Sequence, residues 1–222
     1  MEAHEHVLVV FPHPDDEAFG VSGSIAGFIK NGTPVTYMCL TLGEMGRNMG
    51  NPPFANRETL PLIRKKELET ACKVLGIKDV RMMGYRDKTI EFEDPVIIAD
   101  HVTEVIMEVK PTLIITFYPG YSVHPDHDAC GEAVIEAVRQ LPESERPPVE
   151  CVAFSNDCVE KLGEPDVIRD VADVQDKKIA TIEAHRSQTA GLVAGMKKRL
   201  EANEEEVINR LQRERFWTYK FN

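Results

Sequence analysis

The stretch VLVVFPHPDDEAFG, residues 7–20, joins an apolar run to a turn that carries an imidazole and adjacent carboxylates. A short, β-branched and continuous apolar run is typical of a strand buried on both faces. Pro12 and Pro14 end this strand, because proline has no N–H to donate to a sheet. In an open α/β sheet, ligands bind beyond the carboxyl ends of the strands. The sequence therefore predicts a functional site directly after residue 11.

The rest of the chain continues this alternation of strands and helices. Further strands are expected at 34–42, 79–84, 112–118, 149–155, 166–170 and 216–221, and helices at 18–30, 62–75, 95–109, 128–141, 174–185 and 192–211. This order predicts a single-domain α/β protein, residues 1–222, with a Rossmann-like, mostly parallel sheet sandwiched by helices. The long segment 43–61 is rich in Gly, Asn, Pro and Met, and loops of this length are usually functional.

Composition narrows the class of protein. The chain has 222 residues, of which 42% are hydrophobic, and a net charge of −11. This charge argues against binding to nucleic acid or to an anionic membrane, since both need basic surfaces. The N-terminus lacks the pattern of a signal peptide, and the five cysteines show no CxxC spacing. We expect a cytoplasmic protein with reduced thiols that acts on a small molecule.

A second motif, HPDH at 124–127, follows the predicted strand 112–118 just as HPDD at 13–16 follows the first strand. Either motif alone is equally well explained as a capped turn, because Asp often caps helices and Pro fits beside it. Two such motifs at equivalent ends of parallel strands weaken that explanation. We expect both to emerge at the same edge of the sheet.

Three protein ligands and one open position are typical of a catalytic zinc site. His13, Asp16 and His127 can supply two nitrogens and one oxygen for such a site. The same donor set also suits Fe²⁺, Co²⁺ or Mn²⁺. The sequence therefore predicts a divalent metal centre, with zinc as the first candidate.

The remaining motif residues are then free for catalysis. Asp15 can act as the general base on a water molecule. His124 can stabilise an oxyanion or protonate a leaving amine. Asp126 can hydrogen-bond a histidine and fix its tautomer, as carboxylates behind metal ligands do. This division of roles suits hydrolysis of an amide or ester.

Further landmarks occur in chain order. They are FPHPDDEAFG at 11–20, TLGEMG at 41–46, Arg64 with Glu67-Leu68, Leu75-Gly76, GYRD at 84–87, HPDHDA at 124–129 and AHRSQ at 184–188. With these landmarks, which span residues 7–188, the chain resembles the PIG-L/LmbE-like zinc-dependent N-deacetylases. The resemblance implies a Rossmann-like fold and removal of the acetyl group from an N-acetylglucosamine conjugate.

Within this family the chain is most similar to the bacillithiol branch, whose substrate is N-acetylglucosaminyl malate. The resemblance also implies that Arg64 contacts substrate, although without it an exposed helix residue paired with Glu67 is the favoured interpretation. By matching positions it implies that the metal ligands are His13, Asp16 and His127, with Asp15 as base and His124 as its electrostatic partner.

Other residues are candidates for substrate binding. Arg47, in the long loop, can contact a malate carboxylate or can be an ordinary solvated arginine. Asp87 suits sugar hydroxyls, because carboxylates bind vicinal hydroxyls well. The mycothiol branch of the family has a tyrosine where this chain has Ser122, and Tyr121 lies one place earlier. We expect His185 to brace the site.

Two alternatives remain at this level. One is an amidase that cleaves bacillithiol S-conjugates with the same site but a different acyl pocket. The other is a non-catalytic sugar- or nucleotide-binding module, against which no GxGxxG motif follows the first strand. The expected partner is a small glycoside, and the sequence leaves open whether the chain forms a homo-oligomer.

Overall fold

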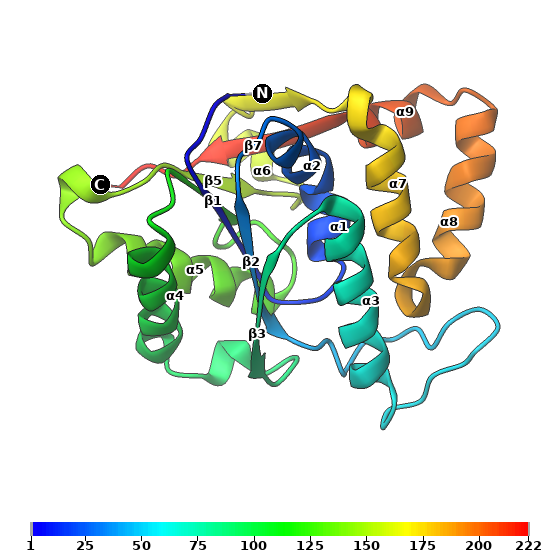
Figure 1. Ribbon diagram of the computed structural model, residues 1–222, viewed down its shortest axis with the longest axis horizontal. Helices are drawn as coiled ribbons and strands as arrows, with labels where there is room; N and C mark the ends of the chain where they lie inside the picture. Colours follow the sequence, from blue (N-terminus) through cyan, green and yellow to red (C-terminus); the bar gives the residue numbers. More distant parts are fainter. Residues whose placement is uncertain (1, 222) are drawn as a thin grey trace.

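A seven-stranded sheet forms the centre of the computed structural model, which describes residues 2–221. Its order is β3-β2-β1-β4-β5-β7-β6 (Figure 1). The strands are β1 (Val7–Phe11), β2 (Val35–Thr41), β3 (Asp79–Tyr85), β4 (Leu113–Phe117), β5 (Val149–Val152), β6 (Val167–Asp170) and β7 (Arg213–Thr218). The helices are α1 (Asp16–Gly20), α2 (Ser22–Lys30), α3 (Leu60–Leu75), α4 (Pro95–Val109), α5 (Pro125–Arg139), α6 (Cys158–Leu162), α7 (Gln175–Ala184), α8 (Arg186–Glu201) and α9 (Glu205–Gln212).

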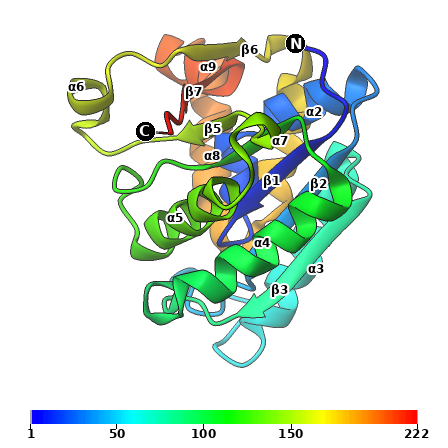
Figure 2. The ribbon, with the colours of Figure 1, turned by 90° about the vertical axis from the view of Figure 1, so that its left-hand side faces the viewer.

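Strand β1 separates two hydrophobic cores. Val7, Val9 and Phe11 face one core, which α2 and α3 cover, whereas Leu8 and Val10 face the other, which α4 and α5 cover. Figure 1 shows α4 and α5 on one side of the sheet and α2, α3 and α7 on the other, and Figure 2 shows α4 and α5 in front of β1. All five β1 side chains are fully buried. The prediction of a strand buried on both faces, within a sheet sandwiched by helices, is confirmed.

The strand order reverses between β1 and β4. These two strands pair in parallel, with Val7 opposite Leu113 and Val9 opposite Ile115. On the far side of β1 lie β2 and β3, and on the far side of β4 lies β5. In doubly wound sheets the crevice at such a reversal is the usual place for a ligand. The segments that follow β1 and β4 carry the two histidine motifs.

The predicted helix 18–30 is in fact two helices, because the chain breaks at Val21. The carboxylate of Glu214, on β7, accepts the backbone N–H groups of Gly23 at 2.9 Å and Ser24 at 2.7 Å. The first N–H groups of a helix have no partner within the helix and need acceptors. A carboxylate from the other end of the chain therefore stabilises a new helix start that periodicity does not reveal.

The predicted helix 192–211 is likewise two helices, α8 and α9. The first begins earlier than expected, where Glu67 accepts hydrogen bonds from the backbone N–H and hydroxyl of Ser187 at 2.7 and 2.6 Å. It ends before Asn203, which has a left-handed backbone with φ of 57°. Left-handed residues commonly end helices.

The edge of the sheet beyond β5 differs from the parallel part. The predicted strand 166–170 is confirmed as β6, and the predicted strand 216–221 lies at β7, somewhat earlier in the chain. Strand β7 pairs antiparallel with both β5 and β6. The short helix α6 was not expected from the sequence. All five cysteines are buried free thiols.

The predicted helix 128–141 begins earlier, at Pro125, so the HPDH motif forms a helix start and not a loop. His124 is the N-cap, and its Nδ1 accepts the backbone N–H of Asp126 at 3.2 Å.

Among residues 2–221, no helix combines the length and the apolar character that crossing a membrane requires.

We predict that Gly131→Ala destabilises the protein, because a methyl group at this position of α5 would clash with the backbone carbonyl of Phe117 at the end of β4. The expected loss in the free energy of unfolding is about 1–3 kcal/mol, as for other overpacked sites. Urea denaturation followed by circular dichroism measures it.

Gly195→Ala is the matched control, since Gly195 lies exposed within α8 and a methyl group there meets open space. Alanine is favoured over glycine inside helices by about 1 kcal/mol, so this variant should be as stable as the wild type or more so. Equal stability of Gly131→Ala and the wild type would contradict the proposed close contact between α5 and β4.

Candidate metal centre and active site

Three segments bring polar side chains to the carboxyl edge of the sheet. The turn after β1 carries His13, Asp15 and Asp16, the start of α5 carries the second histidine motif, and the segment after β3 carries Asp87. His13 and Asp87 are buried. The structure thus brings the two motifs together at one edge, as the sequence predicted.

The three predicted metal ligands lie in one group. Nδ1 of His13 lies 3.3 Å from Oδ2 of Asp16, and Nε2 of His127 lies 3.3 Å from Oδ1 of the same carboxylate. One atom from each residue lies within 4.8 Å of the others. Although burial opposes it, the neighbouring His127 and His13 rings lower the pKa of Asp16 well below its usual range. An ionised carboxylate between two imidazoles suits a divalent cation.

The hydrogen bonds behind these rings orient them toward a metal. Nε2 of His13 lies 3.1 Å from a carboxylate oxygen of Asp126 and 3.1 Å from one of Asp87. Nδ1 of His127 lies 3.1 Å from the carbonyl oxygen of Ser122. If these nitrogens carry the hydrogens, the nitrogens that face Asp16 carry lone pairs. Metal-binding histidines are held in this way, so the residues present fit a metal centre.

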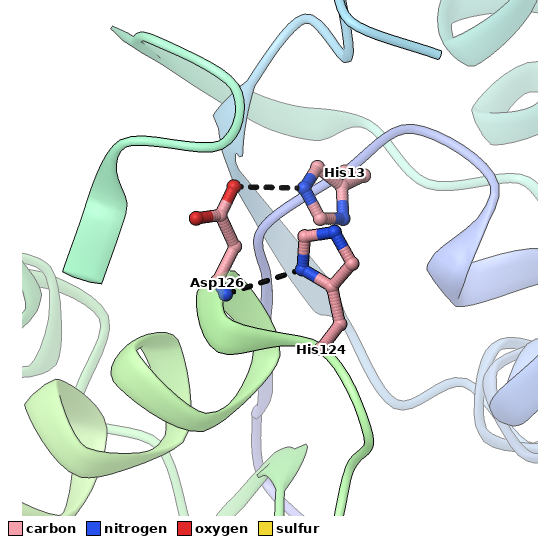
Figure 3. A group of neighbouring side chains, drawn as sticks. All are labelled: His13, His124 and Asp126. Atoms are coloured by element: carbon pink, nitrogen blue, oxygen red, sulfur yellow. Dashed lines mark hydrogen bonds and ion pairs between the residues drawn. The ribbon is translucent and has the colours of Figure 1, made fainter. Parts of the chain in front are cut away.

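A second group of possible ligands contains His13, His124 and Asp126 (Figure 3). Asp126 is fully buried, and its two oxygens accept the backbone N–H groups of Lys88 at 2.7 Å and Ile90 at 3.2 Å. Nδ1 of His124 is also engaged, since it accepts the N–H of Asp126. These contacts suit a hydrogen-bonded frame better than an open metal site.

The hydrogen bond from the N–H of Asp126 determines which nitrogen of His124 carries the hydrogen. With Nδ1 as an acceptor, its hydrogen sits on Nε2 in the neutral ring. Burial, together with the neighbouring rings of His13 and His127, lowers the pKa of His124. The neutral ring can therefore donate one hydrogen bond from Nε2.

Asp15 has an unusual backbone conformation. Its φ of 97° is in the left-handed region, which residues with a Cβ rarely adopt. Its Oδ2 lies 3.1 Å from Nη2 of Arg64. Burial raises the pKa of Asp15 to about 6, and the Arg64 guanidinium partly opposes this rise. Strained residues cluster at functional sites, which fits a special role for this carboxylate.

The side chain of Arg64 is buried, and the alternative of an exposed residue paired with Glu67 is wrong. Besides Asp15, its guanidinium donates to the carbonyl of Gly43 at 2.7 Å and to that of Pro14. Glycine is favoured at position 43, because its φ is 61° and a Cβ there would overlap the guanidinium in its present place. Arg64 thus orders the turn around Asp15, and its contact with substrate stays a prediction.

The other predicted substrate residues lie in different surroundings. Besides its contact with His13, Asp87 accepts the backbone N–H of Met45 at 2.7 Å, so its carboxylate is largely engaged. Arg47 is exposed on the long loop. The ring of Tyr121 packs edge-on against Tyr118, with centroids 5.5 Å apart, in a cluster with Trp217. Their contacts with substrate stay predictions.

Sequence reasoning missed one aromatic residue of the site. Phe154 follows β5 and lies edge-on to the ring of His127, with centroids 5.9 Å apart, and its side chain is 45% exposed. The ring of Phe117 stacks on the same histidine, with centroids 4.1 Å apart. The only signal for Phe154 in the sequence is its position near the carboxyl end of the predicted strand 149–155, which in the structure ends earlier, at Val152.

We predict that His127→Ala removes bound zinc, whereas His124→Ala retains it, because only His127 belongs to the group around Asp16. Zinc content of the purified variants, measured by atomic emission after dialysis, tests this. Loss of zinc from His124→Ala with retention in His127→Ala would place the metal in the second group instead.

The chain is similar to known proteins over nearly its whole length. A protein of Bacillus subtilis named "Probable N-acetyl-alpha-D-glucosaminyl L-malate deacetylase 2" is 54% identical over 98% of this chain and 99% of its own length. The N,N'-diacetylchitobiose deacetylase of Pyrococcus horikoshii has a similar structure, with a TM-score of 0.73 and 25% identity over 97% of this chain and 84% of that one.

A 4-carboxy-2-hydroxymuconate hydratase of Pseudomonas putida has a TM-score of 0.74 at 20% identity, over 98% of this chain and 97% of that one, and this likeness concerns the fold alone. The model of the PIG-L family, described as GlcNAc-PI de-N-acetylase, matches residues 8–138, which include both histidine motifs. This match covers more than half of the chain, and with the 54% identical relative it shows that the chain belongs to the PIG-L family.

Proposed function

We propose that this protein is a metal-dependent N-deacetylase that hydrolyses the acetyl amide of N-acetylglucosaminyl L-malate, a step in bacillithiol biosynthesis. The observation that carries the proposal is the arrangement of the site. Asp16 lies between His13 and His127, and Asp15 and His124 flank this group from the two histidine motifs. The relative from Bacillus subtilis, similar over its whole length, supports the choice of substrate.

We assign His13, Asp16 and His127 as the metal ligands and zinc as the metal, with Fe²⁺, Co²⁺ and Mn²⁺ as alternatives that the donor set also accepts. A divalent cation held there supplies a Lewis acid that polarises an amide carbonyl and makes water more acidic. Asp126 and Asp87 hold the His13 ring in place from behind.

Asp15 removes a proton from the attacking water. Its carboxylate is held by Arg64 on one side and is mostly shielded from solvent, and a shielded carboxylate is a stronger base than an exposed one. His124 donates a hydrogen bond from Nε2 to the oxyanion that forms when water attacks the amide carbonyl. The proton that Asp15 took from the water then passes to the amide nitrogen, the C–N bond breaks, and acetate and the free amine of the sugar are released.

The substrate residues complete the proposal. Asp87 contacts sugar hydroxyls with the part of its carboxylate that His13 and Met45 leave free, and Arg64 and Tyr121 are the candidates for further contacts with the substrate. Arg47 is an exposed cation two residues after Met45, whose N–H binds Asp87, and we assign it to a malate carboxylate of the substrate. A small polar glycoside of this kind is a metabolite, so we also propose that the protein acts in the cytoplasm.

We predict that Asp15→Asn retains zinc but lowers kcat for acetate release from N-acetylglucosaminyl malate by ~10²–10⁴-fold, the usual contribution of a general base. Asparagine tolerates the left-handed backbone of this position, so the fold is expected to persist. Acetate release and zinc content, measured on the same samples, test both expectations.

The outcomes separate the candidate reactions. Wild-type turnover in Asp15→Asn would contradict the assignment of the base. No acetate release from the zinc-loaded wild type, combined with mercapturate release from a bacillithiol S-conjugate, would replace the deacetylase with the conjugate amidase. A chain that binds no zinc and releases neither product would favour the binding module.

We predict that Arg47→Ala raises KM for N-acetylglucosaminyl malate about tenfold, equivalent to about 1.4 kcal/mol, with little change in kcat. The reason is loss of an ion pair that forms equally in the ground state and the transition state. The methyl glycoside of N-acetylglucosamine, which lacks malate, is the control substrate, and its KM should be unchanged. An equal rise in KM for both substrates would contradict a role in malate recognition.

A further inference from the structure

A buried carboxylate lies next to the metal centre without belonging to it. Glu17, on α1, is fully buried, and neither group of possible metal ligands includes it. Its Oε2 accepts the backbone N–H of Asp15 at 3.0 Å and the hydroxyl of Tyr37 at 3.3 Å. Its Oε1 lies 2.5 Å from Nε2 of His185. Since solvent and substrate cannot reach it, Glu17 can act only through these neighbours.

The contact with Asp15 falls on a residue with a strained backbone, whose φ is 97°. A left-handed backbone is unfavourable for a residue with a Cβ and persists only where the surroundings hold it. The N–H of Asp15 is held by Glu17, and its carbonyl oxygen accepts the N–H groups of Ala18 at 3.0 Å and Phe19 at 3.3 Å. Of these contacts, only the one from Glu17 comes from a side chain.

His185 anchors Glu17 from a distant part of the chain. It lies between α7 and α8, and its carbonyl oxygen accepts the N–H groups of Gln188 at 2.9 Å and Thr189 at 3.0 Å at the start of α8. Its ring is fully buried, and within residues 2–221 its Nδ1 has no partner. The hydrogen bonding of the ring is therefore directed to Glu17.

We propose that Glu17 and His185 are positioning residues that hold the backbone of Asp15 in its left-handed conformation and so direct its carboxylate toward the attacking water. This inference rests on the proposed role of Asp15 as the general base. It assigns a function to two landmarks of the sequence that the metal centre does not use, the glutamate of HPDDE and the histidine of AHRSQ. The pair acts as one unit, because each residue reaches Asp15 through the same contact.

The test compares Glu17→Gln with Glu214→Gln. Glu214 is also a buried carboxylate that pairs with a cation, Lys178 at 2.5 Å, and accepts backbone N–H groups, but it does so at the start of α2. Loss of either carboxylate weakens the fold, whereas only loss of Glu17 disturbs Asp15. Both variants are assayed for zinc content and for acetate release from N-acetylglucosaminyl malate, below their melting temperatures.

We expect Glu17→Gln to retain zinc and the KM of the wild type, and to lose kcat on the order of tenfold to a hundredfold, as small misplacements of catalytic groups do. Glu214→Gln should melt at a lower temperature with an unchanged kcat. His185→Ala should resemble Glu17→Gln, and His185→Gln, which keeps a donor for Glu17, should recover part of the lost kcat. If Glu17→Gln does not fold, the comparison of His185→Ala with His185→Gln tests the proposal instead.

Wild-type kcat in folded Glu17→Gln or His185→Ala would overturn the proposal, as would equal losses of kcat in Glu17→Gln and Glu214→Gln. Asp15→Asn is measured alongside. If it loses turnover while Glu17→Gln keeps it, only the positioning role fails. If Asp15→Asn keeps full turnover, the role of the base fails, and the positioning role falls with it.

Discussion

The parallel pairing of β1 with β4 is the constraint on which the site depends. It aligns Val7 with Leu113 and Val9 with Ile115, so that both strands release the chain at the same edge of the sheet. Because β4 ends at this edge, α5 has to begin there, and the lack of a side chain at Gly131 lets the helix pack against the end of the strand. Two histidine motifs that are distant in the sequence therefore meet around the carboxylate of Asp16. The sheet itself brings them together.

Buried carboxylates hold the segments around this edge in place. Glu214 accepts backbone N–H groups at the start of α2, Glu67 does so at the start of α8, and Asp126 does so in the segment after β3. An unpaired buried charge is strongly destabilising, and the N–H groups at a helix start lack acceptors within the helix. A hydrogen bond from a backbone N–H to a buried carboxylate compensates the charge and also provides the N–H group with an acceptor. In each case it joins residues far apart in sequence, so the same bonds that compensate the charges also hold distant segments of the fold together.

The parts of the fold that depend on local patterns could be predicted from the sequence. The alternation of strands and helices along the chain, the mostly parallel sheet and the residues of the two motifs all depend on apolar runs and on the residues directly after each run. The break at Val21 could not be predicted, because it depends on Glu214 at the opposite end of the chain. Arg64 shows the same limit, since spacing along its helix suggests Glu67 as partner, whereas the fold supplies Asp15. Local sequence patterns identify the residues with reactive side chains. They do not identify the residues, distant in the sequence, that bind those side chains in the fold.

The fold alone does not decide the reaction, since a hydratase shares it at 20% identity. The reaction that we propose depends on a local feature, a carboxylate at a position whose backbone conformation glycine would adopt with less strain. Glu17 accepts the N–H of Asp15 and Arg64 pairs with its side chain, and we propose that these contacts maintain the conformation. Both partners are buried, and a buried charged group is retained only where it is well compensated. Charged contacts from α1 and α3 thus keep one carboxylate beside the residues that we propose as metal ligands, and through these contacts the fold shapes the site of the proposed reaction.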